Sequence, residues 1–158
     1  MIKVGIGYDA HRLVKGERFV IGGVEIPNEY GSVGHSDGDV LIHAIVDSLL
    51  GAANFGDIGK LFPSSEKKWK DCNSLNFLDI SNGKLMSKGY EIIHIDSTII
   101  LQTPIISEFI PGMKNKISKI LDIELSQISI KATTTDYLGY IGESKGLAAQ
   151  SISTIQNK

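Results

Sequence analysis

The chain has 158 residues, of which 42% are hydrophobic and 22% are charged. This length is enough for one globular domain with a substantial core, but two independent domains would be cramped. The 16 basic and 18 acidic residues give a formal net charge of −2, so the bulk charge does not mark a nucleic-acid-binding protein, and an anionic ligand must be held locally. We therefore predict one domain over residues 1–158 and no nucleic-acid partner.

The apolar stretches are far shorter than the roughly 20 residues that cross a bilayer, so we expect no membrane partner. The first five residues alternate like a strand and lack the basic region and long apolar run of a signal peptide. These features favour a cytoplasmic location, with an organelle matrix as the alternative. The one cysteine, Cys72, cannot form an internal disulfide and, with no second cysteine beside it, is a poor zinc ligand.

Two strand-forming patterns open the chain. Apolar residues alternate with small or polar ones over 2–8, which predicts a half-buried strand that leads into Asp9-Ala10-His11. Apolar runs at 19–21 and 24–26 flank Gly22-Gly23, and glycine can adopt the positive φ angles that a tight hairpin turn requires.

A helix is predicted next, from Gly38 to Ala53, because apolar residues recur at helical spacing and either Ser36 or Asp37 can serve as its N-cap. His43 falls in the second turn of this helix. Residues 54–70 are rich in Gly, Ser and Lys and predict a loop.

The second half of the chain predicts further helices and strands. Helical spacing covers about 74–88 and 110–121, and strand patterns cover 91–101 and 128–134. The carboxyl-terminal segment fits either type, and we favour a strand near 146–152.

Asp9 and His11 are two residues apart, so they project from the same face of an extended strand. His43, on the predicted helix, can add a third ligand. One carboxylate with two imidazoles suits a zinc site that keeps one position open for a substrate. The same spacing also fits a strand-end cap or an ion pair, so the residues alone leave both interpretations open.

Two further segments carry groups that suit phosphate. Residues 34–39 place small and polar groups before a helix N-terminus, which attracts anions; a capping loop in which Ser36 or Asp37 binds the first helical amides explains the same pattern. Residues 131–136 end a strand with three threonine hydroxyls and the Asp136 carboxylate, which can contact phosphate and a divalent cation. Threonine is also simply a good strand residue.

These segments occur together with others in one order and with one set of spacings. The motifs are Gly7-Tyr8-Asp9-Ala10-His11-Arg12-Leu13, Ile21-Gly22-Gly23-Val24-Glu25-Ile26-Pro27, His35-Ser36-Asp37-Gly38-Asp39 with His43, Gly51-Ala52-Ala53, Gly56-Asp57-Ile58-Gly59-Lys60-Leu61-Phe62-Pro63 and Lys131-Ala132-Thr133-Thr134-Thr135. Over essentially its whole length the chain resembles the 2-C-methyl-D-erythritol 2,4-cyclodiphosphate synthase family of the non-mevalonate isoprenoid pathway.

The resemblance implies a fold and a reaction. The expected architecture is α/β (α+β), with a mixed four-stranded sheet, helices on one face, and a homotrimer in which three such sheets face one another. The expected reaction is a metal-dependent intramolecular phosphoryl transfer. The 2-phosphate of 4-diphosphocytidyl-2-C-methyl-D-erythritol 2-phosphate attacks the β-phosphorus, which closes the 2,4-cyclodiphosphate and expels CMP. Positioning and metal ions are the expected sources of catalysis.

The resemblance also implies cofactors and catalytic residues. His35 and Thr134 match the positions that stabilise the transition state. Asp136 would bind Mg²⁺ or Mn²⁺ between the α and β phosphates. One Zn²⁺ per subunit, whose fourth position takes a β-phosphate oxygen, would be held by Asp9, His11 and His43.

The implied substrate contacts fall into three groups. The zinc and phosphate group comprises Asp9, Ala10, His11, His35 and Ser36. The methylerythritol group comprises Asp57, Ile58 and Gly59 with the loop residues Phe62, Pro63, Ser64, Ser65 and Glu66. The cytidine diphosphate group, which the neighbouring subunit of the trimer supplies, comprises Leu101, Gln102, Thr103, Pro104, Ile105, Ile106, Ser107, Thr133, Thr134, Thr135 and Asp136. Tyr140 stands where the family has an aromatic residue and completes the set.

Two positions depart from the family. Asp136 is one carbon shorter than the Glu often found there, so the cation is held differently or through water. Glu143 stands where an arginine is often found, and a carboxylate cannot donate a hydrogen bond to a diphosphate. We therefore do not predict isoprenoid binding in the central cavity of the trimer.

Three residues stay outside the predicted site. His94 is expected to be structural or to lie at an interface. Asp47, one turn after His43, either orients that imidazole or is solvated. Lys131 either meets a phosphate or pairs at the sheet edge. Two other functions fit the same residues: a zinc-dependent phosphohydrolase, in which bound water attacks phosphorus, and a non-catalytic nucleotide-binding trimer with structural zinc.

Overall fold

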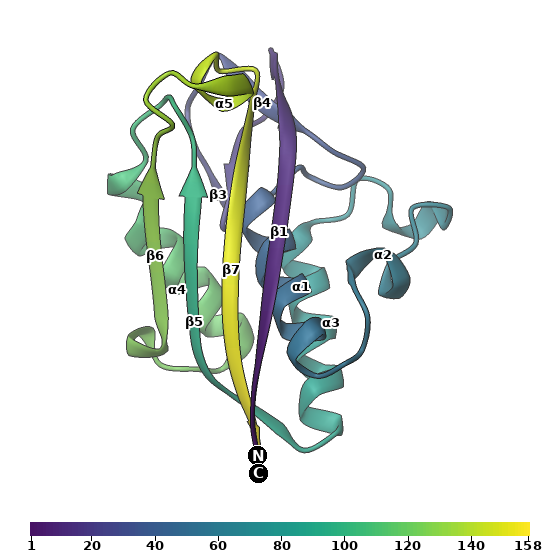
Figure 1. Cartoon of the computed structure of the whole chain (residues 1–158). Coiled ribbons are helices and arrows are strands. Elements are labelled where there is room, and N and C mark those ends of the chain that lie inside the picture. Colours follow the sequence, from purple (N-terminus) through teal and green to yellow (C-terminus); the bar gives the residue numbers. More distant parts are fainter.

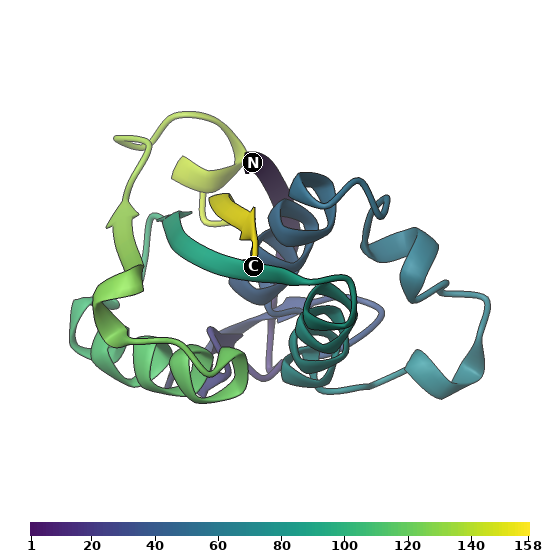
Figure 2. The same cartoon turned by 90° about the horizontal axis from the view of Figure 1, so that it is seen from below.

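A mixed five-stranded sheet with helices packed on one face forms the centre of the computed structural model, which describes all residues 1–158 (Figures 1 and 2). The strand order is β4-β1-β7-β5-β6, and only β5 and β6 are parallel neighbours. The strands of this sheet are β1 (Ile2–Lys15), β4 (Tyr30–Val33), β5 (Tyr90–Ile100), β6 (Ile128–Thr133) and β7 (Gly146–Asn157). A separate hairpin comprises β2 (Val20–Ile21) and β3 (Val24–Glu25).

Three longer helices cover one face of the sheet, and shorter helical turns lie around it (Figure 2). The long helices are α1 (Val40–Ala52), α3 (Ser74–Ser87) and α4 (Ile110–Leu121). The short ones are α2 (Ile58–Leu61), α5 (Gly139–Gly142), and the 3-10 turns η1 (Lys67–Trp69), η2 (Ser107–Phe109) and η3 (Leu125–Gln127). One hydrophobic cluster lies between the sheet and these helices. None of the helices combines the length and the apolar character needed to span a bilayer.

The α+β class and the mixed sheet are confirmed, but the predicted number of four strands is wrong. The strand predicted to lead only as far as His11 continues to Lys15, and its last four residues pair with β4. This longer strand provides the edge on which the fifth strand forms. The carboxyl-terminal segment, which fitted either a helix or a strand, is strand β7, and it pairs with β1 along most of its length.

Asp39 is the N-cap of α1, so the predicted caps Ser36 and Asp37 are wrong. Its side chain accepts from the Ile42 amide at 3.1 Å, from the Gly22 amide at 2.9 Å and from the Gly23 amide at 2.7 Å. The two glycines have φ angles of +59° and +73°, which L side chains rarely adopt, and the tight turn points their amides at this carboxylate. One buried side chain therefore joins the hairpin to the start of the helix.

The buried face of β1 is the glycine face and not the apolar face. Gly5 and Gly7 lie against α1, and a Cβ atom there would sit 2.0 Å from the Ser48 carbonyl oxygen and 1.9 Å from the Ala44 carbonyl oxygen, respectively. The opposite face carries four apolar side chains that are 57–66% exposed, namely Ile2, Val4, Ile6 and Tyr8. The strand is half-buried as predicted, but α1 packs on the glycine face, where it can approach the strand backbone most closely.

Replacing Gly7 by alanine tests this close contact. The added methyl group would overlap the Ala44 carbonyl oxygen, and we expect the Gly7→Ala variant to lose about 3 kcal/mol of unfolding free energy in chemical denaturation. Gly83→Ala is the matched control: Gly83 lies within α3, and a Cβ there meets no atom within 4 Å. Removing a helical glycine should stabilise the protein by about 0.5–1 kcal/mol. Equal stability of Gly7→Ala and the wild type would contradict the packing argument.

Candidate metal centre and active site

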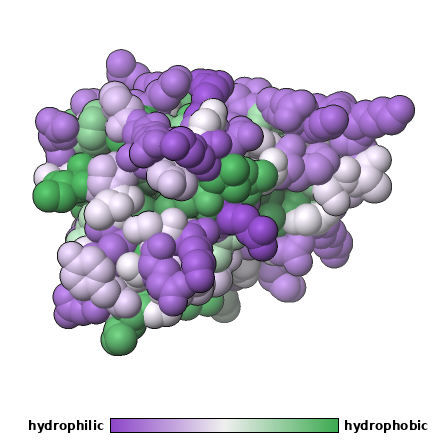
Figure 3. Space-filling view, turned by 90° about the horizontal axis from the view of Figure 1, so that it is seen from above, coloured by the Kyte–Doolittle hydropathy of each residue, from purple (hydrophilic) through white to green (hydrophobic).

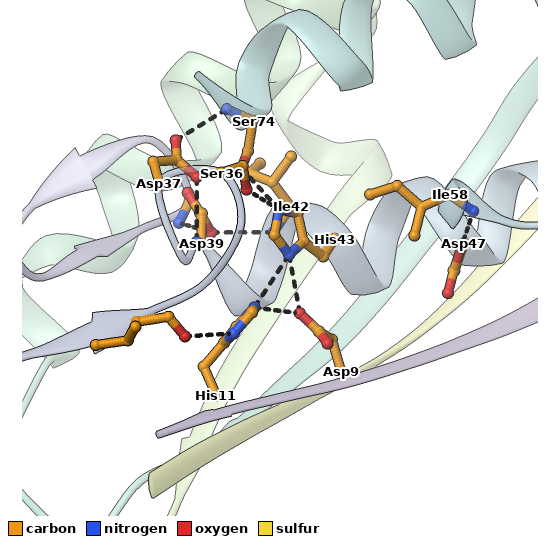
Figure 4. Close-up of polar contacts among 12 residues, drawn as sticks. Asp9, His11, Ser36, Asp37, Asp39, Ile42, His43, Asp47, Ile58 and Ser74 are labelled. Carbon is orange, nitrogen blue, oxygen red and sulfur yellow. Dashed lines mark hydrogen bonds and ion pairs between the residues drawn. The ribbon is translucent and has the colours of Figure 1, made fainter. Parts of the chain in front are cut away.

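Asp9, His11 and His43 form a cluster of potential metal ligands (Figure 4). Asp9 Oδ2 lies 2.8 Å from His11 Nε2 and 2.9 Å from His43 Nδ1, and the two nitrogens are 3.1 Å apart. Asp9 and His11 project from the glycine face of β1, and His43 projects from α1, which lies on that face. The close contact between helix and strand thus brings together the three predicted ligands.

Hydrogen bonding determines the charge within this cluster. Burial alone would raise the pKa of Asp9, but hydrogen bonds and ion pairing with His11 and His43 outweigh it and lower this pKa to about 2. Burial likewise opposes the charged form of His11, yet the hydrogen bond to Asp9 raises the pKa of His11 above its ordinary value. His11 Nδ1 is 3.0 Å from the Val33 carbonyl oxygen. Because a carbonyl only accepts, this nitrogen carries the proton, and the other ring nitrogen faces the cluster.

The three side chains fit a zinc ion. A carboxylate and two imidazoles are ordinary zinc ligands, and in a tetrahedral site such ligand atoms are about 3.3 Å apart. The separations of 2.8–3.1 Å in this cluster need to expand by only a few tenths of an ångström. Asp9 lies inside β1 and faces both histidines, so the alternative of a strand-end cap is wrong.

A cavity of about 370 Å³ lies beside the cluster and is lined by His11 and His43 together with two of the predicted substrate segments. The lining residues are His11, His35, Ser36, His43, Ile58, Gly59, Phe62, Pro63, Ser64, Ser65, Trp69 and Phe77. Asp57 is outside this lining; it is exposed, and as the N-cap of α2 it accepts from the Lys60 amide at 2.8 Å. Glu66 is also outside and pairs with Lys68 at 2.6 Å.

Phe62, Trp69 and Phe77 form an aromatic wall of this cavity, of which only Phe62 was predicted from the sequence. Phe62 and Phe77 stack with their ring centroids 4.4 Å apart, and Trp69 meets them edge-on at 5.0 Å and 5.7 Å. A tryptophan within a polar, Lys-rich loop was the available signal, since a large aromatic side chain in such a loop indicates packing or binding.

The predicted cytidine group lies elsewhere in the same chain. The segment after β5 and the segment after β6 are adjacent, since the Leu101 amide donates to the Thr133 carbonyl at 2.9 Å and the Tyr137 amide donates to Gln102 Oε1 at 3.0 Å. In the sheet, however, β6 is three strand positions from β1, which is about 14 Å at ordinary strand spacing. The chain therefore gathers most of the predicted residues into two separate groups, although Thr103 of the cytidine group lines one cavity with Ala10 and His11.

A second, larger cavity of about 970 Å³ is lined by residues of β1 and of the segment 140–146, together with Asn28, Tyr30 and Thr103. Its lining includes Ala10, His11, Thr103 and Tyr140, all of them predicted substrate residues. Tyr140 Oη is 3.3 Å from Tyr8 Oη, and this hydrogen bond together with burial raises the pKa of Tyr140 to about 12. Seen from above, this end of the molecule carries apolar patches between hydrophilic side chains (Figure 3).

Of the three residues that stayed outside the predicted site, Asp47 and Lys131 have structural contacts. His94 is exposed on the uncovered face of β5 and is not part of the cluster. Asp47 accepts from the Ile58 amide at 2.7 Å and does not contact His43 (Figure 4). The interpretation that Asp47 orients His43 was therefore wrong, because its half-buried carboxylate instead fixes the start of α2. Lys131 pairs with Asp96, as the sheet-edge alternative predicts, and Glu143 pairs with Lys145.

Comparisons with known proteins bear directly on this arrangement. The model of the YgbB family matches residues 2–156. The chain belongs to this family. A relative from Clostridium acetobutylicum, named 2-C-methyl-D-erythritol 2,4-cyclodiphosphate synthase, is 52% identical over 151 residues, which cover 96% of this chain and 97% of the relative. The resemblance drawn from the motifs is thereby confirmed, and with it the prediction of an enzyme.

Solved structures agree with the family assignment. The IspF of Plasmodium falciparum, solved as a CDP complex, matches with a TM-score of 0.88 and 38% identity, over 99% of this chain and 97% of that one. The bifunctional IspDF of Campylobacter jejuni matches with a TM-score of 0.96 and 37% identity. The match covers 100% of this chain but only 43% of the bifunctional chain.

The buried N-cap of the ligand-bearing helix predicts a pH dependence of stability. Burial, and then the neighbouring charge of Asp37, raise the pKa of Asp39 from 3.8 to about 6. A raised carboxyl pKa stabilises the folded state most when the group is protonated, and this contribution is lost as the pH rises towards the folded pKa. We expect the unfolding free energy of the wild type to fall by up to about 3 kcal/mol relative to the Asp39→Asn variant between pH 4 and 6.

Urea denaturation of both proteins across this pH range measures the difference. The exposed Asp122 at the end of α4 provides the control variant Asp122→Asn, which should follow the wild type throughout because no burial acts on that carboxylate. If the unfolding free energies of Asp39→Asn and the wild type changed in parallel with pH, the raised pKa of Asp39 would be contradicted.

Proposed function

We propose that this chain, acting as one domain over residues 1–158, converts 4-diphosphocytidyl-2-C-methyl-D-erythritol 2-phosphate to 2-C-methyl-D-erythritol 2,4-cyclodiphosphate with release of CMP. The observation that carries the proposal is the Asp9, His11 and His43 cluster beside a cavity lined by the predicted phosphate and methylerythritol residues. Membership of the YgbB family and the name shared by its relatives support the same reaction.

The proposed reaction is intramolecular. An oxygen of the 2-phosphate attacks the β-phosphorus and forms the new P–O bond, while the bond from that phosphorus to the oxygen bridging the α-phosphorus breaks. The bridging oxygen keeps the electron pair and leaves as part of CMP. Since no water takes part, the protein has to bring two anionic groups together and stabilise the charge that develops between them.

The chain supplies groups for both tasks. Asp9, His11 and His43 would hold zinc, which when bound supplies positive charge to a phosphate oxygen. His35 and Ser36 line the cavity beside these ligands, and we assign them to contacts with phosphate oxygens. We assign His35 and Thr134 to stabilising the transition state.

The remaining substrate contacts follow the two groups of residues. The aromatic wall and the residues Ile58, Gly59 and Phe62–Ser65 suit the carbon skeleton of methylerythritol. Asp57 would contact its hydroxyls and Glu66 would close over it. We assign Leu101–Ser107 and Thr133–Asp136 to the cytidine diphosphate, in line with the Plasmodium falciparum IspF solved with CDP.

Asp136 would share Mg²⁺ or Mn²⁺ with the diphosphate of the substrate. It is an exposed carboxylate outside the zinc cluster, so the phosphate oxygens and water have to supply most of the ligands of that cation. Near this end of the sheet, Glu143 is paired with Lys145. We assign no isoprenoid diphosphate site to Glu143.

We further propose that the active form is a homotrimer with shared sites. Ile2, Val4, Ile6 and Tyr8 are exposed on the uncovered face of β1, and Ile152 on the neighbouring β7 is 46% exposed. An apolar sheet face of this kind is stabilised by burial against other copies. The separation of the two residue groups within one chain supports the same assembly, since a neighbouring copy can supply the missing half of each site.

Product analysis tests the reaction. Purified protein loaded with zinc is incubated with the substrate and Mg²⁺, and phosphorus NMR follows the products. We expect equal amounts of cyclic diphosphate and CMP, and a loss of at least about a thousandfold in rate for His43→Ala. Cys72→Ala is the control, because this thiol is outside the cluster, and the variant should keep its zinc and its rate.

Two outcomes would reject the synthase. A linear product that contains oxygen from labelled water would identify a phosphohydrolase. Binding of CDP without turnover would identify a nucleotide-binding protein.

Mixing two inactive variants tests the shared sites. His43→Ala removes a zinc ligand and Asp136→Asn removes the proposed second-cation ligand, so each homotrimer should be inactive. After the two are refolded together in equal amounts, about a quarter of the sites should combine an intact half from each variant, and activity should return to about that fraction of the wild-type value. A mixture that stays inactive would show that each site is built from one chain.

A further inference from the structure

The far side of the His43 ring faces two serine hydroxyls. His43 Nδ1 points to Asp9 and His11, while Nε2 is 2.9 Å from Ser74 Oγ and 2.8 Å from Ser36 Oγ (Figure 4). A neutral imidazole has one protonated and one unprotonated nitrogen. For Nδ1 to be a metal ligand, the proton has to be on Nε2, and a hydrogen-bond acceptor has to receive it there.

Ser74 is held as that acceptor. It is fully buried, and its hydroxyl lies within hydrogen-bond distance of Asp37 Oδ1, while its amide donates to Asp37 Oδ2 at 2.8 Å. An ionised carboxylate can only accept, so the Ser74 hydroxyl proton has to point to Asp37. The lone pairs of Ser74 Oγ are then left for His43 Nε2–H.

Asp37 is itself fixed in place. Besides Ser74, it accepts from the Asp39 amide at 3.2 Å, and it lies at the N-terminus of α3, where Ser74 is the first helical residue. The free amides and the dipole of a helix N-terminus favour a negative charge at this position. Asp37 is thus connected to the starts of both α1 and α3, and Ser74 cannot turn without breaking these contacts.

Ser36 has no such constraint. Its only side-chain hydrogen bond is the one to His43 Nε2, and it lines the cavity in which the substrate phosphate is proposed to bind. Its hydroxyl is free to turn towards a ligand. The two serines at similar distances from one nitrogen therefore differ in role.

We propose that Asp37 and Ser74 are positioning residues for the metal centre: they fix the proton of His43 on Nε2 and thereby present Nδ1 as the ligand atom, while Ser36 remains available to the substrate. Val33 performs the equivalent task for His11 through its carbonyl oxygen. The inference rests on the proposed zinc centre. It adds two residues that neither touch the ion nor line the cavity.

The first test is the protonation state of His43 in the wild-type protein. Nitrogen-15 NMR of the imidazoles in the zinc-loaded protein shows which nitrogen of His43 carries the proton. Zinc has to be present because, in its absence, the Asp9 carboxylate 2.9 Å from Nδ1 competes for the same proton. We expect the Nε2–H form. A predominant Nδ1–H form in the wild type would overturn the inference whatever the variants do.

The second test is zinc affinity, measured by competition with a chromogenic chelator. We expect Ser74→Ala and Asp37→Asn to bind zinc about 10–100-fold more weakly than the wild type. In Asp37→Asn, an NH₂ group that cannot accept a hydrogen bond replaces one carboxylate oxygen. Either the Ser74 amide or the Ser74 hydroxyl then loses its acceptor. Ser74→Thr, which keeps the hydroxyl, should retain an affinity within about threefold of the wild type.

Ser36→Ala is the matched control, since it removes a hydroxyl that is equally near the same nitrogen. We expect its zinc affinity to stay within about threefold of the wild type and its defect to appear as a raised KM. Equal loss of zinc affinity in Ser36→Ala and Ser74→Ala, or unchanged affinity in Ser74→Ala, would overturn the inference. Failure of the wild type itself to bind zinc would instead reject the proposed metal centre.

Discussion

The direct contact between α1 and the glycine face of β1 is the constraint on which the rest of the molecule depends. With side chains at Gly5 and Gly7, the helix would have to move outward, because its Ala44 and Ser48 carbonyl oxygens occupy the space a Cβ would take. The close approach of the helix to the strand brings His43 within hydrogen-bond distance of Asp9 and His11 on β1. It also leaves the apolar residues of the same strand exposed on the opposite face. One packing contact therefore determines both the cluster of potential metal ligands and the exposed apolar face of the sheet.

The loop from Gly34 to Asp39 has little regular structure, yet it holds its groups firmly. Asp39 accepts three backbone amides, and Asp37 accepts two amides and lies within hydrogen-bond distance of the Ser74 hydroxyl. Each carboxylate accepts from backbone amides that would otherwise be paired with carbonyl groups of a strand or helix. The two carboxylates therefore hold a non-repetitive segment in a fixed conformation beside the cluster of potential metal ligands.

The sequence predicted most elements because each depends on local pattern. The same patterns made three residues candidate ligands: the alternation through β1 placed Asp9 and His11 together, and helical spacing placed His43. It did not predict what depends on long-range contacts. Alternation shows that β1 has two faces but not which face the helix covers. Three polar residues precede α1, and only the position of the hairpin amides selects Asp39 as the cap. Likewise Ser74 and Phe77 reach the site only through the docking of α3.

The order of the strands has a consequence for how the amount of enzyme relates to activity. Because β7 and β5 separate β1 from β6, most residues of the two groups lie apart within one chain, and under the proposed function a lone chain is an incomplete catalyst. In the proposed trimer, the concentration of complete sites follows mass action and varies with the third power of the free chain concentration when assembly is weak. On dilution, the activity then falls much more steeply than the protein concentration. Tight subunit association is therefore needed for catalysis in the proposed trimer.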